Sequence, residues 1–155
     1  MGRKSDSLEQ YTEQLGNLAS FIAHACAFTG HRPQKLPWRT DEADPGCVAL
    51  KTMLAAQIVK LIEDGYTEFM SGMAPGVDMW AAQMILNLRE KHPGLKLHCI
   101  LPCAAQSAKW SAALQMQYRA ILEQADSIIF VNRAERENSM LERDRFLESV
   151  KLKPA

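Results

Sequence analysis

The 155-residue chain lacks several features that would place it in a specialised class of protein. Its formal net charge is zero, so no overall positive field attracts nucleic acid or an anionic membrane. No apolar run approaches the roughly 20 residues needed to cross a bilayer, and the amino-terminal residues lack the apolar run of a secretory signal. We therefore expect a cytoplasmic protein with no membrane partner, in which any anion site is built locally.

Cysteine pairs and the common nucleotide-binding fingerprints are also missing. The four cysteines include no C-x-x-C pair, which favours buried thiols. A zinc site could be drawn from Cys99, Cys103, His98 and His92, but the paired spacing of such sites is absent. Neither G-x-G-x-x-G nor the P-loop G-x-x-x-x-G-K-[ST] occurs, which argues against a P-loop ATPase. The sequence predicts no metal and no cofactor.

What the chain has instead is a regular alternation of short apolar runs and amphipathic segments. The runs predict strands at residues 25–29, 66–71, 95–101 and 127–131, and the amphipathic segments predict helices at about 45–64, 77–90, 106–123 and 138–150. This order predicts an α/β, Rossmann-like three-layer fold with a mainly parallel sheet of four or more strands, covered by helices on both faces. Ligands of such folds bind beyond the carboxyl ends of the strands.

An amphipathic helix is expected before the first strand, starting at a capping-box pattern formed by Ser7 and Gln10. The chain then divides into this helix at residues 1–24, the α/β domain at 25–150 and a tail at 151–155. The apolar stripe of the helix could pack on its own sheet or against another copy, so a homodimer is one expected partner. The stripe consists of Leu8, Tyr11, Leu15, Leu18 and Ile22.

Two loops at the predicted carboxyl edge carry residues suited to an anionic ligand. In these loops, glycines let the backbone approach a ligand, an arginine can grip phosphate, and a helix N-terminus favours an anion. The first loop contains Thr29, Gly30, His31 and Arg32, and the second contains Ser71, Gly72, Met73, Ala74, Gly76, Val77 and Asp78.

Each of these features has a structural alternative. The glycines of the second loop could serve only a tight turn, with Ser71 capping locally and Asp78 meeting the helix dipole. Arg32 could form a surface salt bridge. In the third loop, Trp110 could stack on a base while Gln106 bonds to its edge, or Trp110 could pack in the core. Trp80, in the helix after the second loop, is interpreted as structural.

The motifs Phe28-Thr29-Gly30-His31-Arg32-Pro33, Ser71-Gly72-Met73-Ala74-Pro75-Gly76-Val77-Asp78 and Leu101-Pro102-Cys103 resemble the signature of the SLOG superfamily, in its uncharacterised bacterial Rossmann-like branch. The second loop is similar to that of the DNA-processing protein A family, which implies single-stranded nucleic acid as a partner. Met140 to Asp144 is similar to the helix motif of the lonely-guy phosphoribohydrolases, and Arg143 would correspond to their arginine at the ribose phosphate.

The chain departs from these families after that helix, because they continue into a further strand and a Gly-Gly-x-Gly-Thr loop. In the hydrolases a catalytic glutamate follows, and no residue here matches it, so the catalytic residues are unknown. The leading hypothesis is binding or sensing of a nucleotide-like small molecule without chemistry. The alternatives are hydrolysis of a nucleotide's N-glycosidic bond and binding of single-stranded nucleic acid, the latter opposed by the zero charge.

Overall fold

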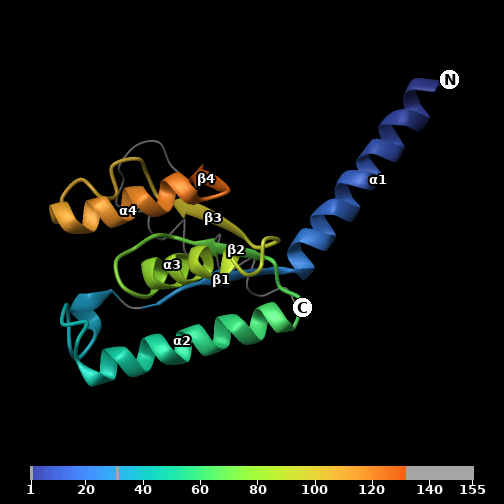
Figure 1. The fold of residues 1–155 in the computed structure, drawn as a ribbon. Coiled ribbons are helices and arrows are strands. Elements are labelled where there is room, and N and C mark those ends of the chain that lie inside the picture. The colour runs from blue at the N-terminus through green and yellow to red at the C-terminus, as the bar shows by residue number, and fades with distance from the viewer. Residues whose placement is uncertain (1, 31, 132–155) are drawn as a thin grey trace.

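The computed structural model describes residues 2–30 and 32–131. As predicted, strands alternate with helices in a Rossmann-like three-layer α/β fold preceded by an N-terminal helix (Figure 1). The elements in chain order are α1 (Gly2–Ala23), β1 (Ala25–Phe28), the 3-10 helix η1 (Pro33–Lys35), α2 (Pro45–Glu63), β2 (Glu68–Ser71), α3 (Val77–Arg89), β3 (Lys96–Leu101), α4 (Ala112–Gln124) and β4 (Ser127–Phe130). The helix expected at 138–150 and the tail at 151–155 lie outside the described residues.

The four strands form one parallel sheet in the order β1-β2-β3-β4. Every crossover therefore joins neighbouring strands in the same direction. Right-handed crossovers in that order place α2, α3 and α4 on the same face of the sheet. The main core confirms this placement, because Ile58 of α2, Ile85 of α3 and Ile121 of α4 join one buried cluster with Phe69 and Leu97 of the sheet.

The opposite face of the sheet carries a second, smaller cluster of buried side chains. Ala27, Met70 and Ile100 belong to it, and Phe21 near the end of α1 packs against it. Side chains are therefore buried on both faces of the sheet, as the period-two pattern of a central parallel strand requires. The expected cover of connecting helices on both faces is not seen within the described residues, where all three lie on one face.

Two predicted helix starts are corrected by the structure. α4 begins at Ala112 rather than near residue 106, because residues 104–109 form turns and Ser111 is the N-cap, accepting from the backbone N of Leu114 at 3.3 Å. α1 begins at Gly2, so Ser7 lies inside the helix and not at its cap. α2 starts as its sequence suggests, with Asp44 accepting from the backbone N of Gly46 at 2.8 Å.

One helix departs from the expectation that no stretch reaches membrane-spanning length. α2 is long and apolar enough to cross a membrane when length and composition alone are considered. Its inner face is nevertheless part of the domain core, since Cys47 and Ile58 are fully buried and Leu54, Leu61 and Ile62 pack against the main cluster. An apolar helix that covers a sheet passes the same composition test as a membrane span.

Candidate ligand-binding site

The loops after β1, β2 and β3 open on the same edge of the sheet, as the sequence predicts. The register pairs Phe28 with Ser71, Ser71 with Cys99 and Leu101 with Phe130, so the carboxyl ends of all four strands lie side by side. This edge is where ligands of open parallel sheets bind. His31 and Arg143, two of the predicted contacts, lie outside the described residues.

The loop between β2 and α3 is held by its own polar side chains. The buried hydroxyl of Ser71 donates to the carbonyl of Asp78 at 2.8 Å and accepts from the backbone N of Met73 at 3.2 Å. The carboxylate of Asp78, only 4% exposed, accepts from the backbone N of Ala74 at 3.4 Å. Two of the amides expected to cradle a phosphate are therefore engaged within the loop, in a conformation that gives Met73 a φ of 60°.

The second half of this loop leads into an open helix N-terminus. Gly76 is the N-cap of α3 with φ 93° and ψ −132°, a conformation that side-chain-bearing residues adopt only under strain. No side chain within the described part of the chain caps this end. The first backbone amides of α3 carry the positive end of the helix dipole, so this end of the helix attracts anions.

The first loop touches this helix start through a glycine. A Cβ added to Gly30 would lie 2.5 Å from the Cβ of Val77, so only glycine allows this approach. Thr29 is exposed beside it, and Arg32 is half-buried at the N-terminus of η1. The close contact fixes the first loop against the first residue of α3.

The third loop braces the second loop through the side chain of Gln106. The side-chain amide of Gln106 donates to the carbonyls of Gly72 and Met73 at 3.3 and 3.4 Å and to the hydroxyl of Tyr118 at 3.4 Å. Trp110 lies edge-on to Tyr118, with ring centroids 5.1 Å apart, and packs against the main core. Burial raises the pKa of Tyr118, which keeps its hydroxyl protonated.

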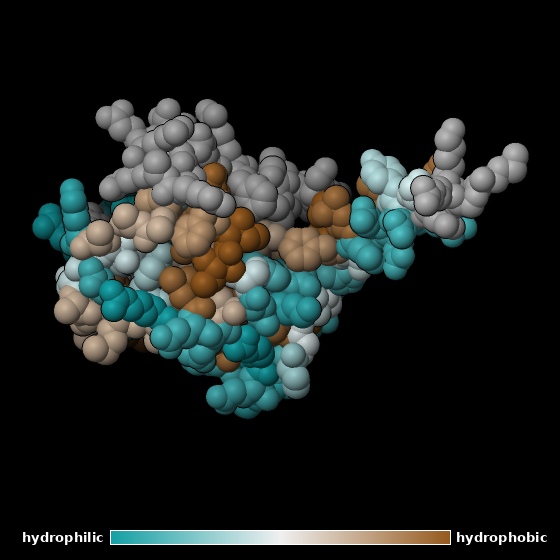
Figure 2. Space-filling view, turned by 90° about the horizontal axis from the view of Figure 1, so that it is seen from above, coloured by the Kyte–Doolittle hydropathy of each residue, from teal (hydrophilic) through white to brown (hydrophobic). Residues whose placement is uncertain are grey.

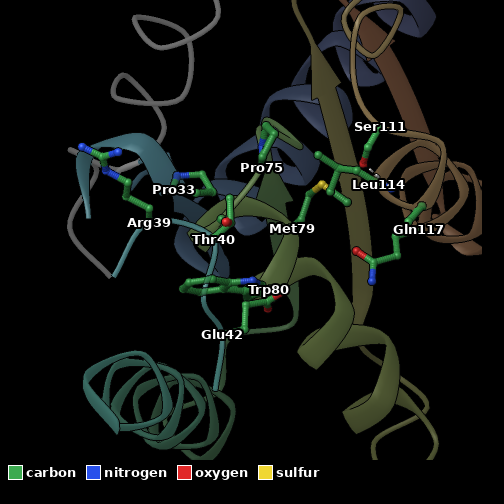
Figure 3. A pocket seen from close by; sticks show the side chains of 12 residues that line it. Pro33, Arg39, Thr40, Glu42, Pro75, Met79, Trp80, Ser111, Leu114 and Gln117 are labelled. Carbon is green, nitrogen blue, oxygen red and sulfur yellow. Dashed lines mark hydrogen bonds between the residues drawn. The ribbon is translucent and has the colours of Figure 1, made fainter. Parts of the chain in front are cut away.

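A cleft of about 260 Å³ lies between the first loop, the start of α3 and the start of α4 (Figure 3). Among the predicted site residues that the structure describes, only Gly76 lines this cleft. Among the other predicted residues that the structure describes, Ser71, Asp78 and Gln106 hold the second loop by hydrogen bonds. The lining residues are Pro33, Arg39, Thr40, Glu42, Pro75, Gly76, Met79, Trp80, Ser111, Ala113, Leu114 and Gln117.

Sequence reasoning missed the polar and aromatic residues of the cleft, and it interpreted Trp80 as structural. The Nζ of Lys51 lies 4.8 Å from the ring centroid of Trp80 and forms an ion pair with Glu42 at 2.5 Å. Arg39 brings a second cation to the rim from a turn, where its φ is 52°. The signal available in the sequence was the dense run of Trp38, Arg39 and Glu42 in a long loop at the predicted carboxyl edge.

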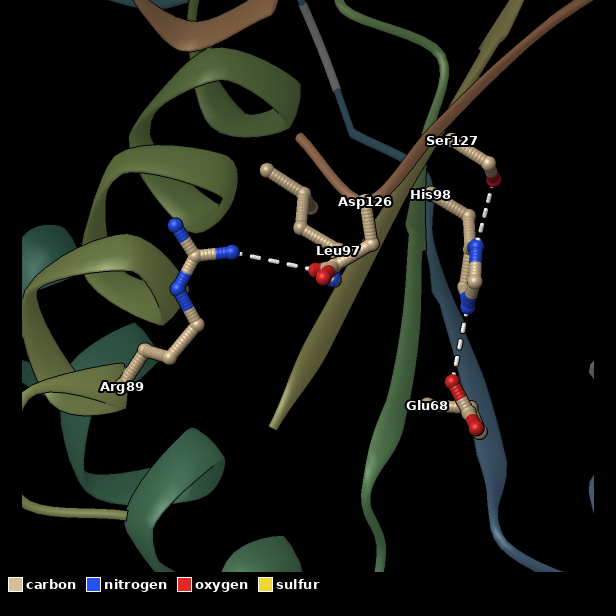
Figure 4. A network of polar contacts seen from close by, with 6 residues as sticks. All are labelled: Glu68, Arg89, Leu97, His98, Asp126 and Ser127. Atoms are coloured by element: carbon tan, nitrogen blue, oxygen red, sulfur yellow. Dashed lines mark hydrogen bonds and ion pairs between the residues drawn. The ribbon is translucent and has the colours of Figure 1, made fainter. Parts of the chain in front are cut away.

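A separate polar network lies at the amino ends of the strands (Figure 4). The Nε2 of His98 is 2.7 Å from a carboxylate oxygen of Glu68, and its Nδ1 is 2.5 Å from the hydroxyl of Ser127. In a hydrolytic triad the serine meets Nε2 and the acid meets Nδ1, which is the reverse of this arrangement. The three residues come from β3, β2 and β4, so the network links three strands.

Asp126 makes a second link in the same region. Its carboxylate accepts from Arg89 at 3.0 Å and from the backbone N of Leu97 at 2.8 Å, which ties the start of β4 to α3 and β3. Within residues 2–30 and 32–131, no group of three His, Cys, Asp or Glu side chains is placed to hold a metal ion.

The fold and its carboxyl edge define a Rossmann-like α/β domain. Residues 26–149 match the family model described as the YspA SLOG family, and the chain belongs to that family. The resemblance in the sequence motifs is thereby confirmed. The matched region starts after α1, so this helix precedes the family domain.

Related bacterial proteins carry the name UPF0398. The chain is 34% identical over 111 residues to one from Brevibacillus brevis, which covers 70% of this chain and 59% of that protein. It is 34% identical over 83 residues to one from Halalkalibacterium halodurans (54% and 44%), and 33% over 103 residues to one from Bacillus pumilus (66% and 54%). The chain spans about half the length of the curated relatives it matches.

Proposed function

We propose that this chain binds a nucleotide, or a ligand derived from one, in the cleft at the carboxyl edge of the sheet. The observation that carries the proposal is that three chemically distinct residues line one cleft. They are Gly76 at the uncapped start of α3, Arg39 at the rim, whose guanidinium points outward in Figure 3 and would turn towards a bound phosphate, and Trp80 with its indole. A helix N-terminus and an arginine suit a phosphate, and an indole suits a base.

The size of the cleft limits the ligand. Its volume of about 260 Å³ lies just below the range of typical small-molecule sites, which is roughly 300–1,000 Å³. We therefore infer that a mononucleotide, or one nucleotide half of a larger ligand, enters the cleft. Arg32 lies outside the lining, so Arg39 takes the phosphate-binding role in this proposal.

Thermal denaturation against AMP, ATP, NAD, ADP-ribose and cyclic nucleotides tests the proposal. A ligand at one hundred times its Kd stabilises the folded state by about 2.7 kcal/mol. For a chain of this length, that corresponds to a rise in Tm of about 5–11 °C. The expected result is such a rise with one class of nucleotide, reduced in both Arg39→Gln and Trp80→Leu.

Arg119→Gln is the matched control, because Arg119 is an exposed arginine of α4 that does not line the cleft. This variant should keep the full ligand response. Equal responses in Arg39→Gln, Trp80→Leu and Arg119→Gln would place binding elsewhere. A response only to single-stranded oligonucleotides, falling steeply with salt, would indicate nucleic-acid binding instead.

Hydrolysis of the N-glycosidic bond is a second candidate because one carboxylate lines the cleft. Glu42 contacts Lys51, and its side chain is 53% exposed, so water reaches it. A carboxylate in this position could activate water or stabilise a developing oxocarbenium ion. The candidate predicts release of free base from the bound nucleotide and loss of that release in Glu42→Gln with binding retained. Binding without base release in the parent chain would leave only the binding function.

A further inference from the structure

The helix α1 presents an apolar stripe that residues 25–30 and 32–131 of its own domain leave uncovered. Leu8, Tyr11, Leu15 and Leu18 are 68%, 61%, 49% and 54% exposed. α1 projects away from the sheet, and the view from above shows both hydrophobic and hydrophilic residues along it (Figures 1 and 2). Contiguous exposed apolar side chains of this size mark an interaction surface.

The spacing of the stripe identifies the kind of partner it suits. Its members follow one another at intervals of three, four, three and four residues up to Ile22. This 3.5-residue repeat is the a/d pattern of a helix that pairs with another helix, and it extends over two heptads. A helix that packs on a sheet of its own domain needs a broader apolar face than this narrow seam.

The positions that flank the stripe favour pairing with an identical helix. In a coiled-coil pair these positions lie against the partner and decide, through their charges, which helices can associate. Here they are Ser7, Thr12, Gln14, Ala19 and Phe21, all of which are uncharged, and Phe21 already packs on the sheet. Two copies of α1 therefore meet without like-charge repulsion along the seam.

The base of α1 is fixed to the domain, so the stripe is held in one direction. The ring of Phe21 lies edge-on to His98 with centroids 5.6 Å apart. The carbonyl of His24 accepts from the backbone N atoms of Thr67 and Glu68, both at 3.0 Å. A helix anchored in this way loses less freedom when a partner binds than a free tail does.

We propose that α1 is a self-association element, through which the stripe of one copy packs against the same stripe of a second copy. A membrane is a poorer occupant, because the stripe is accompanied by Glu9 and Glu13, and the two basic residues of α1, Arg3 and Lys4, both precede it in the sequence. α1 also lies before residues 26–149, which match the family model, so the proposed pairing surface lies outside the matched domain.

Sedimentation equilibrium of the full chain from about 1 to 200 μM tests the proposal, since a dimer of this kind depends on concentration. The mass is expected to rise from 17.4 kDa towards twice that value. Leu15→Glu, which places like charges across the seam, should hold the mass at 17.4 kDa throughout. Gln10→Glu, the same new charge on the polar face, should associate as the parent does.

Hydrogen exchange supplies a second readout that does not depend on measuring mass. The amides of α1 should exchange more slowly at high than at low concentration in the parent, and not in Leu15→Glu. A parent that stays monomeric at 200 μM, or a Leu15→Glu variant that still dimerises, overturns the proposal. So does binding of monomeric chain to phosphatidylcholine–phosphatidylserine vesicles that Leu15→Glu abolishes, because the stripe would then serve a membrane.

Discussion

Replacing Gly30 with alanine tests whether the first loop really depends on close approach to α3. The new Cβ would lie 2.5, 2.7 and 2.9 Å from the Cβ, Cγ1 and Cγ2 atoms of Val77, whereas carbon atoms pack best at about 3.5–4.0 Å. The nearest of these atoms is attached directly to the backbone, so a rotamer change cannot relieve the clash. The loop and the helix start must therefore separate by about 1 Å.

Overpacking of this kind costs about 1–3 kcal/mol, and the loss of glycine's freedom in the unfolded chain offsets about 0.4–1 kcal/mol. With the midpoints of both ranges, the expected net loss is about 1.3 kcal/mol, which lowers Tm by about 3–5 °C in a chain of this length. Thermal denaturation followed by circular dichroism measures it. Because the loop borders the cleft, the nucleotide response should weaken as well.

Gly94→Ala is the matched control, since nothing lies within 4 Å of its added Cβ and the variant should melt at or slightly above the parent temperature. Gly30→Ala combined with Val77→Gly should recover most of the loss attributed to the clash, once the cost of Val77→Gly alone is subtracted. A Gly30→Ala variant that melts with the parent would refute the close approach.

Two further variants test the supports of the site. Gln106→Leu removes the donor that reaches the carbonyls of Gly72 and Met73, and should lower the free energy of unfolding in urea by about 1–3 kcal/mol. The control Gln124→Leu loses one exposed hydrogen bond within a helix and should lower it by less than about 0.5 kcal/mol. Burial raises the pKa of Cys99 from 9.0 to about 12, so the folded chain keeps a proton that the unfolded chain releases, and stability should fall as pH rises from 9 to 12. Denaturation at several pH values should show a shallower fall in Cys99→Ala, and an unchanged slope would contradict the assignment.

The fold was predictable because its signals are local. Short apolar runs end at Gly30 and Ser71, and the helices between them follow a clear period, so alternation and a parallel sheet follow from residue order. The start of α4 was not predictable from period alone. Gln106 continues the polar pattern of a helix, but its amide bonds to the neighbouring loop, and the helix begins only where Ser111 can cap it.

The carboxyl edge was also predictable, but the lining of the cleft was not. Glycines are easy to single out in a sequence because their role is usually a special backbone geometry. Here Gly30 allows a close contact with Val77, and Gly76 adopts a positive φ. Arg39 and Gln117 carry no such signal, since an arginine in a loop and a glutamine on a helix are ordinary surface residues. Their place in one cleft arises from tertiary packing of segments almost 80 residues apart.

The loop between β2 and α3 shows how a motif can build a site without filling it. Ser71 and Asp78 engage the amides of Met73 and Ala74, which holds the loop in one conformation before any ligand arrives. That arrangement leaves the start of α3 at Gly76 uncapped and directed to the cleft. Rigid placement of an uncapped terminus is what an anion site requires, because amides already ordered need no reorganisation on binding. The motif therefore accounts for the shape of the cleft, and in the proposed function the choice of ligand depends on Arg39, Trp80 and the residues facing them across the cleft.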